Sequence, residues 1–593
     1  MKYDSQKFNN AVSYYTGYLK GKAENRVTFV VIEFENKEAF FSIAPLARAV
    51  HNLKGDLHVV VKDKKSPFLD ILKEAWQAYA EYKEGLKTKK AKALKDFIAA
   101  VNKRTKSNMF EEIFTPPDIC LKSSKSGFEG TLNMAFQPDW HREYRWKDLL
   151  ATAQRILGQG YNLKQNERYG IGFVLVPSTE HTELPLEDYL DSYSIAYTMA
   201  LAAKKMGANV GLSATTDRFS ILAKAVRTAD LATTLRGCEL DKNINEEVFR
   251  KFRVLSKLLR MERMEIADAS FGIHAKGYYG KHFFGEEIGY PSANRKTRWS
   301  SPGQMMLKDR YSPQTALEPR PPLMRYAITE TIPLDIYIET CNLDYFVLTK
   351  KSEKIKKIFD QCEYVRVVGR EMHGYKTDFR VDLLTREGKR REFISSDCDV
   401  RSKVEEDFYK KTGIKAGKFA NFPSGECFVT PERVNGTMIG DVVINVDRSY
   451  RIPAKEPLLL KFSNKGWKLI KGNKKILNVI KKQKREAWKK IILLEKSGSL
   501  PKKIIQDYKD NFNRVGEFSV NTNPKAKVCD YLIVNEKIAR MMHLALGMGF
   551  EPERKTTYHW DIVVNAPRQK MDIYGVDKAE KMHWVLKKGK MVV

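Results

Sequence analysis

Five side chains that commonly bind metal ions stand in four short motifs in the last third of the chain. Each is a Glu, His or Asp placed beside Gly or Pro, or inside a short run of strand-forming residues. They are Glu426 in NFPSGECFVTPE, Glu517 in VGEFSV, His543 in MMHLALG, and His559 and Asp561 in YHWDIVV. Because strand side chains alternate between two faces, a strand at HWDIVV would turn His559 and Asp561 to the same face.

Together the five side chains supply two imidazoles and three carboxylates. That set can complete the shells of two divalent ions only if one carboxylate bridges them and water fills the remaining positions. Mixed nitrogen and oxygen ligands suit zinc, cobalt or manganese better than calcium, which takes oxygen ligands alone. Water held between two such ions ionises near neutral pH and can attack a carbonyl group that the ions polarise. The set therefore predicts hydrolysis.

Each of these residues also has a purely structural explanation. A Glu that follows a Gly usually belongs to a solvated turn, and a His in an apolar run, such as His543, is more often a hydrogen-bonded core residue than a ligand. The pair His559 and Asp561 is more suggestive, because a half-buried imidazole and carboxylate need partners. From the residues alone, a shared metal site and separate structural roles both remain open.

Seven cysteines are scattered along the chain without any C-x-x-C pair. An odd number cannot all pair within one chain, so free thiols in a reducing cytoplasm are expected. The scatter also argues against a zinc site built on thiolates, which leaves oxygen and imidazole as ligands for any metal. A cytoplasmic location without membrane contact is expected, because the first residues lack the apolar segment of a secretion signal and no apolar run is long enough to span a bilayer.

The net charge of +31 raises the question of a nucleic-acid partner, because Lys and Arg neutralise phosphates. Most of this charge is spread along the chain, and only residues 465–490 concentrate it. The apolar residues of that segment recur mostly at steps of three and four, which predicts an amphipathic helical arm within a basic insertion at about 465–510. Its basic side chains form either a solvated helix face or a weak contact with a polyanion.

Strand and helix patterns alternate through the first half of the chain. Strands are expected at 27–33, 57–61, 171–176 and 209–213, and helices at 40–51, 186–206 and 217–228, with a long helix or a helix pair at 68–101. Strand-helix-strand units at this spacing favour a parallel, doubly wound sheet, so residues 1–340 are predicted to form an α/β domain. No glycine-rich phosphate-binding loop accompanies these units, which argues against a nucleotide site.

The composition and the hydrophobic pattern of the sequence change twice after these units. A stretch at about 272–322 is rich in Gly, Pro, Tyr and Arg and predicts a loop insertion that covers a cleft or reaches a partner subunit. From 341 to 593, short apolar runs are separated by turns, which predicts an α+β domain rich in strands. The runs are 365–368, 379–384, 442–446, 458–462 and 562–564. All five candidate ligands fall within this second domain.

The motifs NFPSGECFVTPE, VGEFSVNTNP, HLALG and HWDIVV occur in an order that resembles the aminopeptidase T and aminopeptidase S family of dinuclear metallo-aminopeptidases. The resemblance covers about 340–593 and implies a metallopeptidase domain there. In that family, the residues that match Glu426, Glu517, His543, His559 and Asp561 bind a pair of divalent ions. The resemblance therefore implies metal-dependent release of N-terminal residues from peptides.

The resemblance also implies a homodimer whose N-terminal domain narrows the access of peptide substrates to the metal ions. Hydrolysis requires a carboxylate that transfers a proton to the leaving amine, and Glu426 and Glu517 are the candidates. Phe550 stands where the family commonly has a tyrosine that assists the reaction, and Tyr558 is the candidate substitute. The alternative hypothesis is a catalytically weak or inactive relative that binds a polyanion or a protein through its basic segment.

Overall fold

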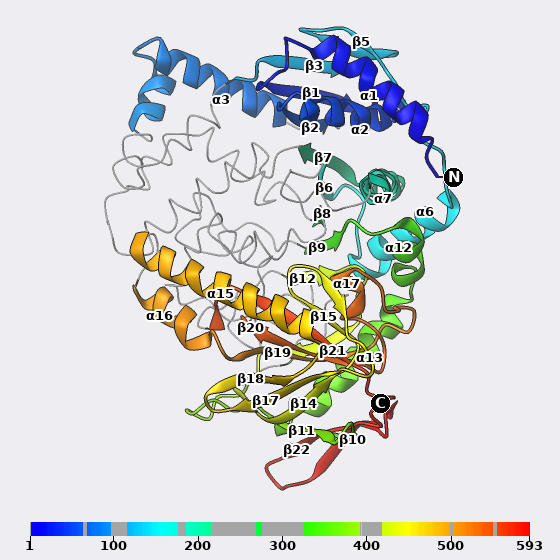
Figure 1. The fold of residues 1–593 in the computed structure, drawn as a ribbon. Helices are drawn as coiled ribbons and strands as arrows, with labels where there is room; N and C mark the ends of the chain where they lie inside the picture. Colours follow the sequence, from blue (N-terminus) through cyan, green and yellow to red (C-terminus); the bar gives the residue numbers. More distant parts are fainter. Residues whose placement is uncertain are drawn as a thin grey trace. The chain divides into compact units, whose positions relative to one another are not determined.

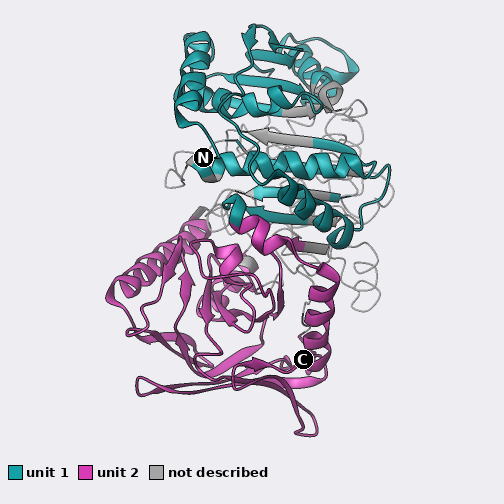
Figure 2. Cartoon of the chain, turned by 90° about the vertical axis from the view of Figure 1, so that its right-hand side faces the viewer, with its two compact units in different colours: residues 1–276, 306–335 teal, residues 277–305, 336–593 magenta. Residues whose placement is uncertain are grey.

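The computed structural model describes residues 2–62, 68–96, 116–175, 186–215, 269–274, 325–391, 393, 418–497, 502–549 and 554–593. The described residues up to Asp335 form one compact unit, and those from Ile336 to Val593 form a second (Figure 2). The predicted domain boundary between 340 and 341 falls close to this division.

The first unit combines one mixed sheet with several helices (Figure 1). Its strands are β1 (Val27–Glu33), β2 (Asp56–Lys62), β3 (Ile119–Ser123), β4 (Gly127–Gly130), β5 (Met134–Ala135), β6 (Arg168–Val174), β7 (Asn209–Thr215), β8 (Ala269–His274) and β9 (Arg325–Glu330). Its helices are α1 (Ser5–Leu19), α2 (Lys37–Asn52), α3 (Phe68–Lys83), α6 (Trp146–Arg155), the π-helix η1 (Ile156–Gly160) and α7 (Leu186–Lys205), and α12 (Leu334–Cys341) lies at the division between the units.

Parallel strands form two blocks of this sheet, in the order β9-β8-β6-β7 and β2-β1-β3. The blocks meet antiparallel between β2 and β7, and the short strands β4 and β5 continue one edge antiparallel. β1 reads as a nearly continuous apolar run, VTFVVIE, and its middle residues are all buried. Strands of a parallel block have this composition because helices bury both of their faces.

The prediction of an α/β first unit is confirmed, and β1 has the predicted bounds. The prediction of a wholly parallel sheet is wrong, because the long segment between β3 and β6 lets the second block join the first in the opposite direction. Of the long helix or helix pair expected at 68–101, the described residues form the pair: α3 ends at Lys83, and a second helical segment begins at Lys89. Gly85 separates the two, since its φ of +71° is one that helical residues do not have. The helix expected at 217–228 and nearly all of the 272–322 insertion lie outside the described residues.

The second unit is rich in strands, as predicted. Its strands are β10 (Cys362–Met372), β11 (Tyr375–Asp382), β12 (Lys418–Asn421), β13 (Glu426–Val429), β14 (Arg433–Gly440), β15 (Val443–Asn445), β16 (Ser449–Arg451), β17 (Leu458–Ser463), β18 (Gly466–Lys471), β19 (Val515–Asn521), β20 (Met542–Gly547), β21 (His559–Val564), β22 (Asp572–Asp577), β23 (Met582–Lys587) and β24 (Lys590–Met591). Its helices are α13 (Tyr345–Phe359), α15 (Lys474–Ser497), α16 (Lys502–Asn511) and α17 (Leu532–Asn535).

Two antiparallel sheets organise the second unit. One has the strand order β18-β17-β14-β11-β10-β22-β23-β24, and the other has the order β13-β19-β20-β21-β15-β16. Both sheets and the helices α13, α15 and α16 contribute side chains to one apolar core. Each sheet therefore turns one face to this core. The opposite face of the six-stranded sheet carries side chains that are not part of the core.

The basic insertion begins as a strand and not as the predicted helix. Gly466 has a φ of +96° and lies in the turn between β17 and β18, where Trp467 is buried and Lys468 is exposed. The helix begins only at Lys474 and places Ile476 in the apolar core. An alternation of buried and exposed side chains in β18 thus precedes the helical periodicity of α15.

The cysteines of the described residues are all free thiols, as expected: Cys120, Cys341, Cys362, Cys427 and Cys529. Among the same residues, no helix combines the length and the apolar character needed to cross a membrane.

The ammonium of Lys484 lies where the basic helix α15 packs against the sheet. Its Nζ lies 3.7 Å from the ring centroid of Trp467, and burial lowers the pKa of Lys484 from 10.5 to about 8. Below pH 8 the folded and unfolded chains are both protonated at this group, so the fold bears the full cost of burying its charge. Between pH 8 and 10.5 the unfolded chain binds more protons, so this group makes stability rise with pH.

We therefore expect Lys484→Met to increase the free energy of unfolding near neutral pH and to flatten its rise between pH 8 and 10.5 in urea denaturation experiments. Lys482 is exposed on the same helix and provides the matched control, because Lys482→Met should change neither quantity appreciably. Equal pH dependence in the wild type and in Lys484→Met would contradict this account of a half-buried ammonium.

Candidate metal centre

The six-stranded sheet has two chemically different faces. On β19, β20 and β21, every second residue enters the apolar core, for example Phe518, Leu544 and Ile562. The residues between them project from the opposite face because strand side chains alternate. That face carries the four predicted ligands of these strands, and Glu426 alternates with the core residue Cys427 in the same way on β13: Glu426, Glu517, His543, His559 and Asp561.

Strand register brings these side chains into neighbouring positions. Glu517 on β19 pairs with Ala545 on β20, and Ala545 pairs with Asp561 on β21, so the three residues form one row across the sheet. The methyl group of Ala545 leaves space between the two carboxylates. His543 lies one step along β20 on the same face, two residues from Ala545.

Two glycines allow the close backbone approaches that place Glu426 and Glu517 in the cluster. Gly425 has a φ of +132°, and a Cβ there would lie 2.7 Å from the backbone nitrogen of Asn523. Gly516 lies at a register shift between β19 and β20, where a Cβ would lie 1.8 Å from the carbonyl oxygen of Met548. Only glycine fits at these two close approaches, so the Gly-Glu pairs of the sequence have a steric cause.

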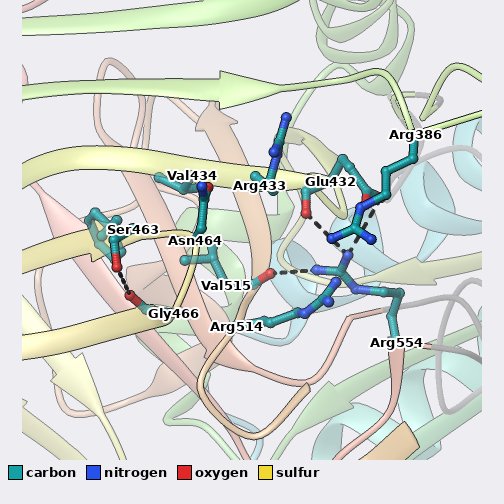
Figure 3. Close-up of a pocket in the computed structure, with 11 residues that line it drawn as sticks. Arg386, Glu432, Arg433, Val434, Ser463, Asn464, Gly466, Arg514, Val515 and Arg554 are labelled. Atoms are coloured by element: carbon teal, nitrogen blue, oxygen red, sulfur yellow. Dashed lines mark hydrogen bonds and ion pairs between the residues drawn. The ribbon is translucent and has the colours of Figure 1, made fainter. Parts of the chain in front are cut away.

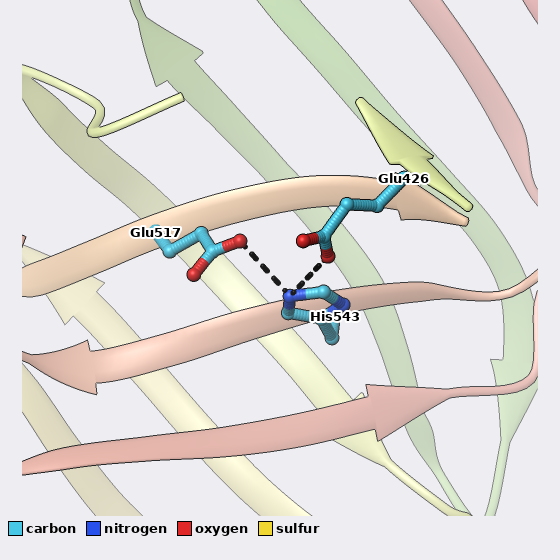
Figure 4. A group of neighbouring side chains, drawn as sticks. All are labelled: Glu426, Glu517 and His543. Carbon is cyan, nitrogen blue, oxygen red and sulfur yellow. Dashed lines mark hydrogen bonds and ion pairs between the residues drawn. The ribbon is translucent and has the colours of Figure 1, made fainter. Parts of the chain in front are cut away.

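Glu426, Glu517 and His543 form the first group of the cluster (Figure 4). The Nε2 atom of His543 lies 3.1 Å from Oε1 of Glu517 and 3.7 Å from Oε2 of Glu426. All three side chains are buried, and three different strands supply them. Carboxylate oxygens and an imidazole nitrogen at these separations can converge on one cation.

Glu517, His559 and Asp561 form the second group. The Nε2 atom of His559 lies 3.3 Å from Oε2 of Glu517 and 3.3 Å from Oδ1 of Asp561. Glu517 therefore offers one oxygen to each group. A carboxylate shared in this way is the geometry that a bridge between two ions requires.

Both imidazoles are oriented by hydrogen bonds on the side away from the cluster. Nδ1 of His543 lies 3.0 Å from Oδ1 of Asn521, and Nδ1 of His559 lies 2.7 Å from the carbonyl oxygen of Met548. Each oxygen accepts a hydrogen bond when Nδ1 carries the proton, which leaves the Nε2 lone pair directed toward the carboxylates. Histidine ligands of metal ions are commonly fixed in this manner.

Lys537 and Glu536 complete the charged surroundings of the cluster, and sequence reasoning missed both. The side chain of Lys537 is 0% exposed, and its Nζ donates to Oε1 of Glu426 at 2.5 Å and lies 3.0 Å from Oε1 of Glu536. The one feature of the sequence that could have indicated them is a Glu-Lys pair directly after the short apolar helix α17. These residues follow a short helix and not a strand, so motif spacing does not connect them to the cluster.

Electrostatic interactions within the cluster are strong. Burial alone would raise the pKa of Glu517, but the imidazoles of His543 and His559 outweigh this effect and lower it to about 2. Burial would lower the pKa of His543, but Glu517, followed by Glu426 and Asp561, raises it to about 9. Metal binding requires neutral imidazoles, so divalent ions would have to replace protons that the carboxylates attract.

Tyr558 does not bring its hydroxyl group to the cluster. Its ring packs on Trp560 with centroids 4.2 Å apart, on the strand face opposite to His559. The hydroxyl donates to the carbonyl oxygen of Phe512 and accepts a hydrogen bond of 3.1 Å from Nε1 of Trp467. The structure thus brings five predicted residues together and places the sixth in the core, while Phe550 lies outside the described residues.

The chain matches none of the known protein families, and no curated protein matches it either. Its function must therefore be argued from the chemistry of the site itself.

The shared position of Glu517 predicts unequal effects of two substitutions on metal content. After dialysis against zinc, we expect about two ions per chain in the wild type, about one in Asp561→Asn and fewer in Glu517→Gln, as measured by mass spectrometry of the metal. Glu580 is exposed in the same unit, and Glu580→Gln serves as the control with wild-type content. If Glu517→Gln retains as much zinc as this control, the shared-carboxylate arrangement is wrong.

Lys537 should matter most when no metal ion is bound. In protein treated with a chelator, Lys537→Met leaves the buried carboxylates without their ammonium, and we expect a loss of about 3–5 kcal/mol in the free energy of unfolding. The exposed Lys525 gives the control, since Lys525→Met should change stability by less than about 0.5 kcal/mol. Zinc should restore part of the loss, and a loss no larger than that of the control would contradict the role assigned to Lys537.

Proposed function

We propose that the protein is a metal-dependent aminopeptidase that releases N-terminal amino acids from peptides. The observation that carries the proposal is the shared position of Glu517, whose two oxygens face two different imidazoles. A binding site for a single structural ion has no need for such sharing. The sequence resemblance to dinuclear aminopeptidases, in the same residues, gives the proposal its substrate class.

The donor set fits a pair of borderline divalent ions. It consists of buried carboxylates and imidazoles without thiolates, which suits zinc, cobalt or manganese. Oδ1 of Asp561 is buried and faces Nε2 of His559 at 3.3 Å, as expected of two atoms that would share a cation. Divalent ions at these two groups would lower the pKa of water in the site and polarise the scissile carbonyl group.

The charges of the surroundings agree with two ions better than with one. Glu426, Glu517, Glu536 and Asp561 carry four negative charges when ionised, and Lys537 offsets one of them. One divalent ion would leave a net negative charge in a buried site, whereas two would leave a small positive charge that favours an anionic transition state.

Glu536 is the residue of this chain that is best placed to transfer a proton. Glu426 holds Lys537 through one oxygen and faces His543 with the other, and both oxygens of Glu517 face imidazoles. These contacts engage the two carboxylates that the sequence suggested for proton transfer. The side chain of Glu536 is 15% exposed, and burial raises its pKa against the opposing effect of Lys537. A carboxyl group in such surroundings can accept a proton from water and pass it to the leaving amine.

The test is hydrolysis of amino-acid arylamides with added cobalt, zinc or manganese. We expect turnover of substrates with a free amino group and none of their N-acetylated forms. Glu517→Gln should be inactive, and Glu536→Gln should lose at least about 100-fold in kcat with unchanged metal content. Glu580→Gln again serves as the control with wild-type activity.

Two results would overturn the proposal. Absence of turnover with every metal, in protein shown to contain metal, would favour the alternative of an inactive relative that binds a polyanion or a protein. The observation behind that alternative is the row of exposed basic residues on α15, such as Lys481, Lys482 and Arg485. Equal cleavage of acetylated and free substrates would instead indicate a different hydrolase.

The proposal includes a cytoplasmic homodimer as its setting. Free thiols at all described cysteines support the reducing compartment. The dimer follows from the sequence resemblance, and light scattering of the purified chain measures it.

A further inference from the structure

A small cavity lined by arginines lies in the second unit, apart from the five residues of the candidate metal centre (Figure 3). It has a volume of about 130 Å³. Its walls come from the start of β14, the turn between β17 and β18, the start of β19 and two loop residues. The lining residues that matter here are Arg386, Glu432, Arg433, Ser463, Arg514 and Arg554.

Positive charge dominates the wall of this cavity. Four of its lining residues are arginines, and the only acid among them is Glu432. Glu432 is already engaged, because its carboxylate lies 2.9 Å from Arg391 and 3.8 Å from Arg554. The carboxylate of Asp382 lies 3.5 Å from Arg433 but also pairs with Arg380.

Arg386 and Arg514 are the two guanidinium groups that the protein leaves for another partner. Neither forms an ion pair with a carboxylate of the described residues. Figure 3 shows Arg386 turned toward Arg554 beside Glu432. Like charges that converge in a partly enclosed space repel one another, so an anion between them would lower the energy.

Arg554 gives the cavity a rigid wall. Its side chain is 4% exposed, and its guanidinium donates to the carbonyl oxygens of Glu432 at 3.3 Å and Val515 at 3.1 Å. These two hydrogen bonds fix the plane of the guanidinium. A fixed guanidinium can recognise an oxyanion with little loss of side-chain entropy.

We propose that this cavity binds a phosphate group, either as the free ion or as a monoester. Guanidinium groups match the geometry of phosphate oxygens through paired hydrogen bonds. The cavity is well below the roughly 300–1,000 Å³ of sites that enclose drug-sized ligands, so it accommodates one small group. Ser463 lies at the edge of the cavity, and its hydroxyl donates to the carbonyl oxygen of Gly466 at 3.4 Å.

The site is independent of the proposed aminopeptidase activity, although strand β19 connects the two places. Val515, whose carbonyl oxygen binds Arg554, precedes Glu517 by two residues. The test must therefore distinguish phosphate in this cavity from phosphate at the metal centre. Glu517→Gln serves that purpose, because it changes the metal centre and leaves the arginines in place.

The experiment is calorimetric titration of the full-length protein with inorganic phosphate at low chloride concentration. We expect saturable binding in the wild type, binding about tenfold weaker in Arg514→Gln, and no saturable binding in Arg386→Gln with Arg514→Gln. The Arg514→Gln substitution keeps the backbone contact of this residue, since its carbonyl oxygen still accepts from the N–H of Gly547. Glu517→Gln should bind phosphate as the wild type does.

The matched control is Lys461→Gln with Lys468→Gln, which removes the same charge from exposed positions of β17 and β18. Equal weakening by this control, loss of binding in Glu517→Gln, or equal binding of acetate would each overturn the proposal. Binding of phosphoserine as tightly as phosphate would support the monoester form of the site. Binding of phosphate alone would support the free ion.

Discussion

Buried negative charge is the constraint on which the second unit depends. Glu426, Glu517 and Asp561 are each 4% exposed or less, on one face of one sheet. Ionised carboxylates in such surroundings cost several kcal/mol each unless cations lie beside them. Apolar side chains would fill the same positions at lower cost, so stability alone does not explain the cluster. A buried cluster of this kind is a candidate for a functional site, in keeping with the proposed metal centre.

The rest of the site follows from the need to hold these charges in fixed positions. Strands position the ligands more accurately than loops, and alternation lets the same strands bury their other face in the core. Small residues stand where the backbone or the ligands come close, namely Gly425, Gly516 and Ala545. Asn521 and the carbonyl oxygen of Met548 hold the imidazoles, and Lys537 supplies a permanent positive charge.

Local patterns in the sequence were sufficient for the parts of the fold that depend on local geometry. The run VTFVVIE has the bounds of β1, and the alternation in HWDIVV places His559 and Asp561 on one face. The same alternation places Tyr558 on the opposite face with Trp560, so its burial in the core was also predictable. In the basic segment, the apolar residues at steps of three and four predicted a helix where the chain first forms the strand β18. Trp467 fits both patterns, whereas Ile470, which the helical pattern would bury, is exposed in the strand.

Contacts between distant segments could not be predicted in this way. Lys537 reaches Glu426 from 111 positions away, and the antiparallel contact of β2 with β7 joins two blocks that each look parallel on their own. The arginine cavity collects its wall from five separate segments, and no motif marks its arginines. Sequence patterns report the period of one element, whereas these features depend on which elements become neighbours.

Strand β19 shows how one local irregularity affects two sites. The register shift at Gly516 separates Val515, whose carbonyl oxygen binds Arg554, from Glu517, which faces both imidazoles. Without the shift, a strand of period two would turn residues 515 and 517 to the same face with the same pairing to β20. The shift lets Val515 contribute to the apolar core while Glu517 stays on the polar face. Because the carbonyl oxygen of Met548 allows no side chain at position 516, the geometry of the acidic cluster and that of the basic cavity depend on the same glycine.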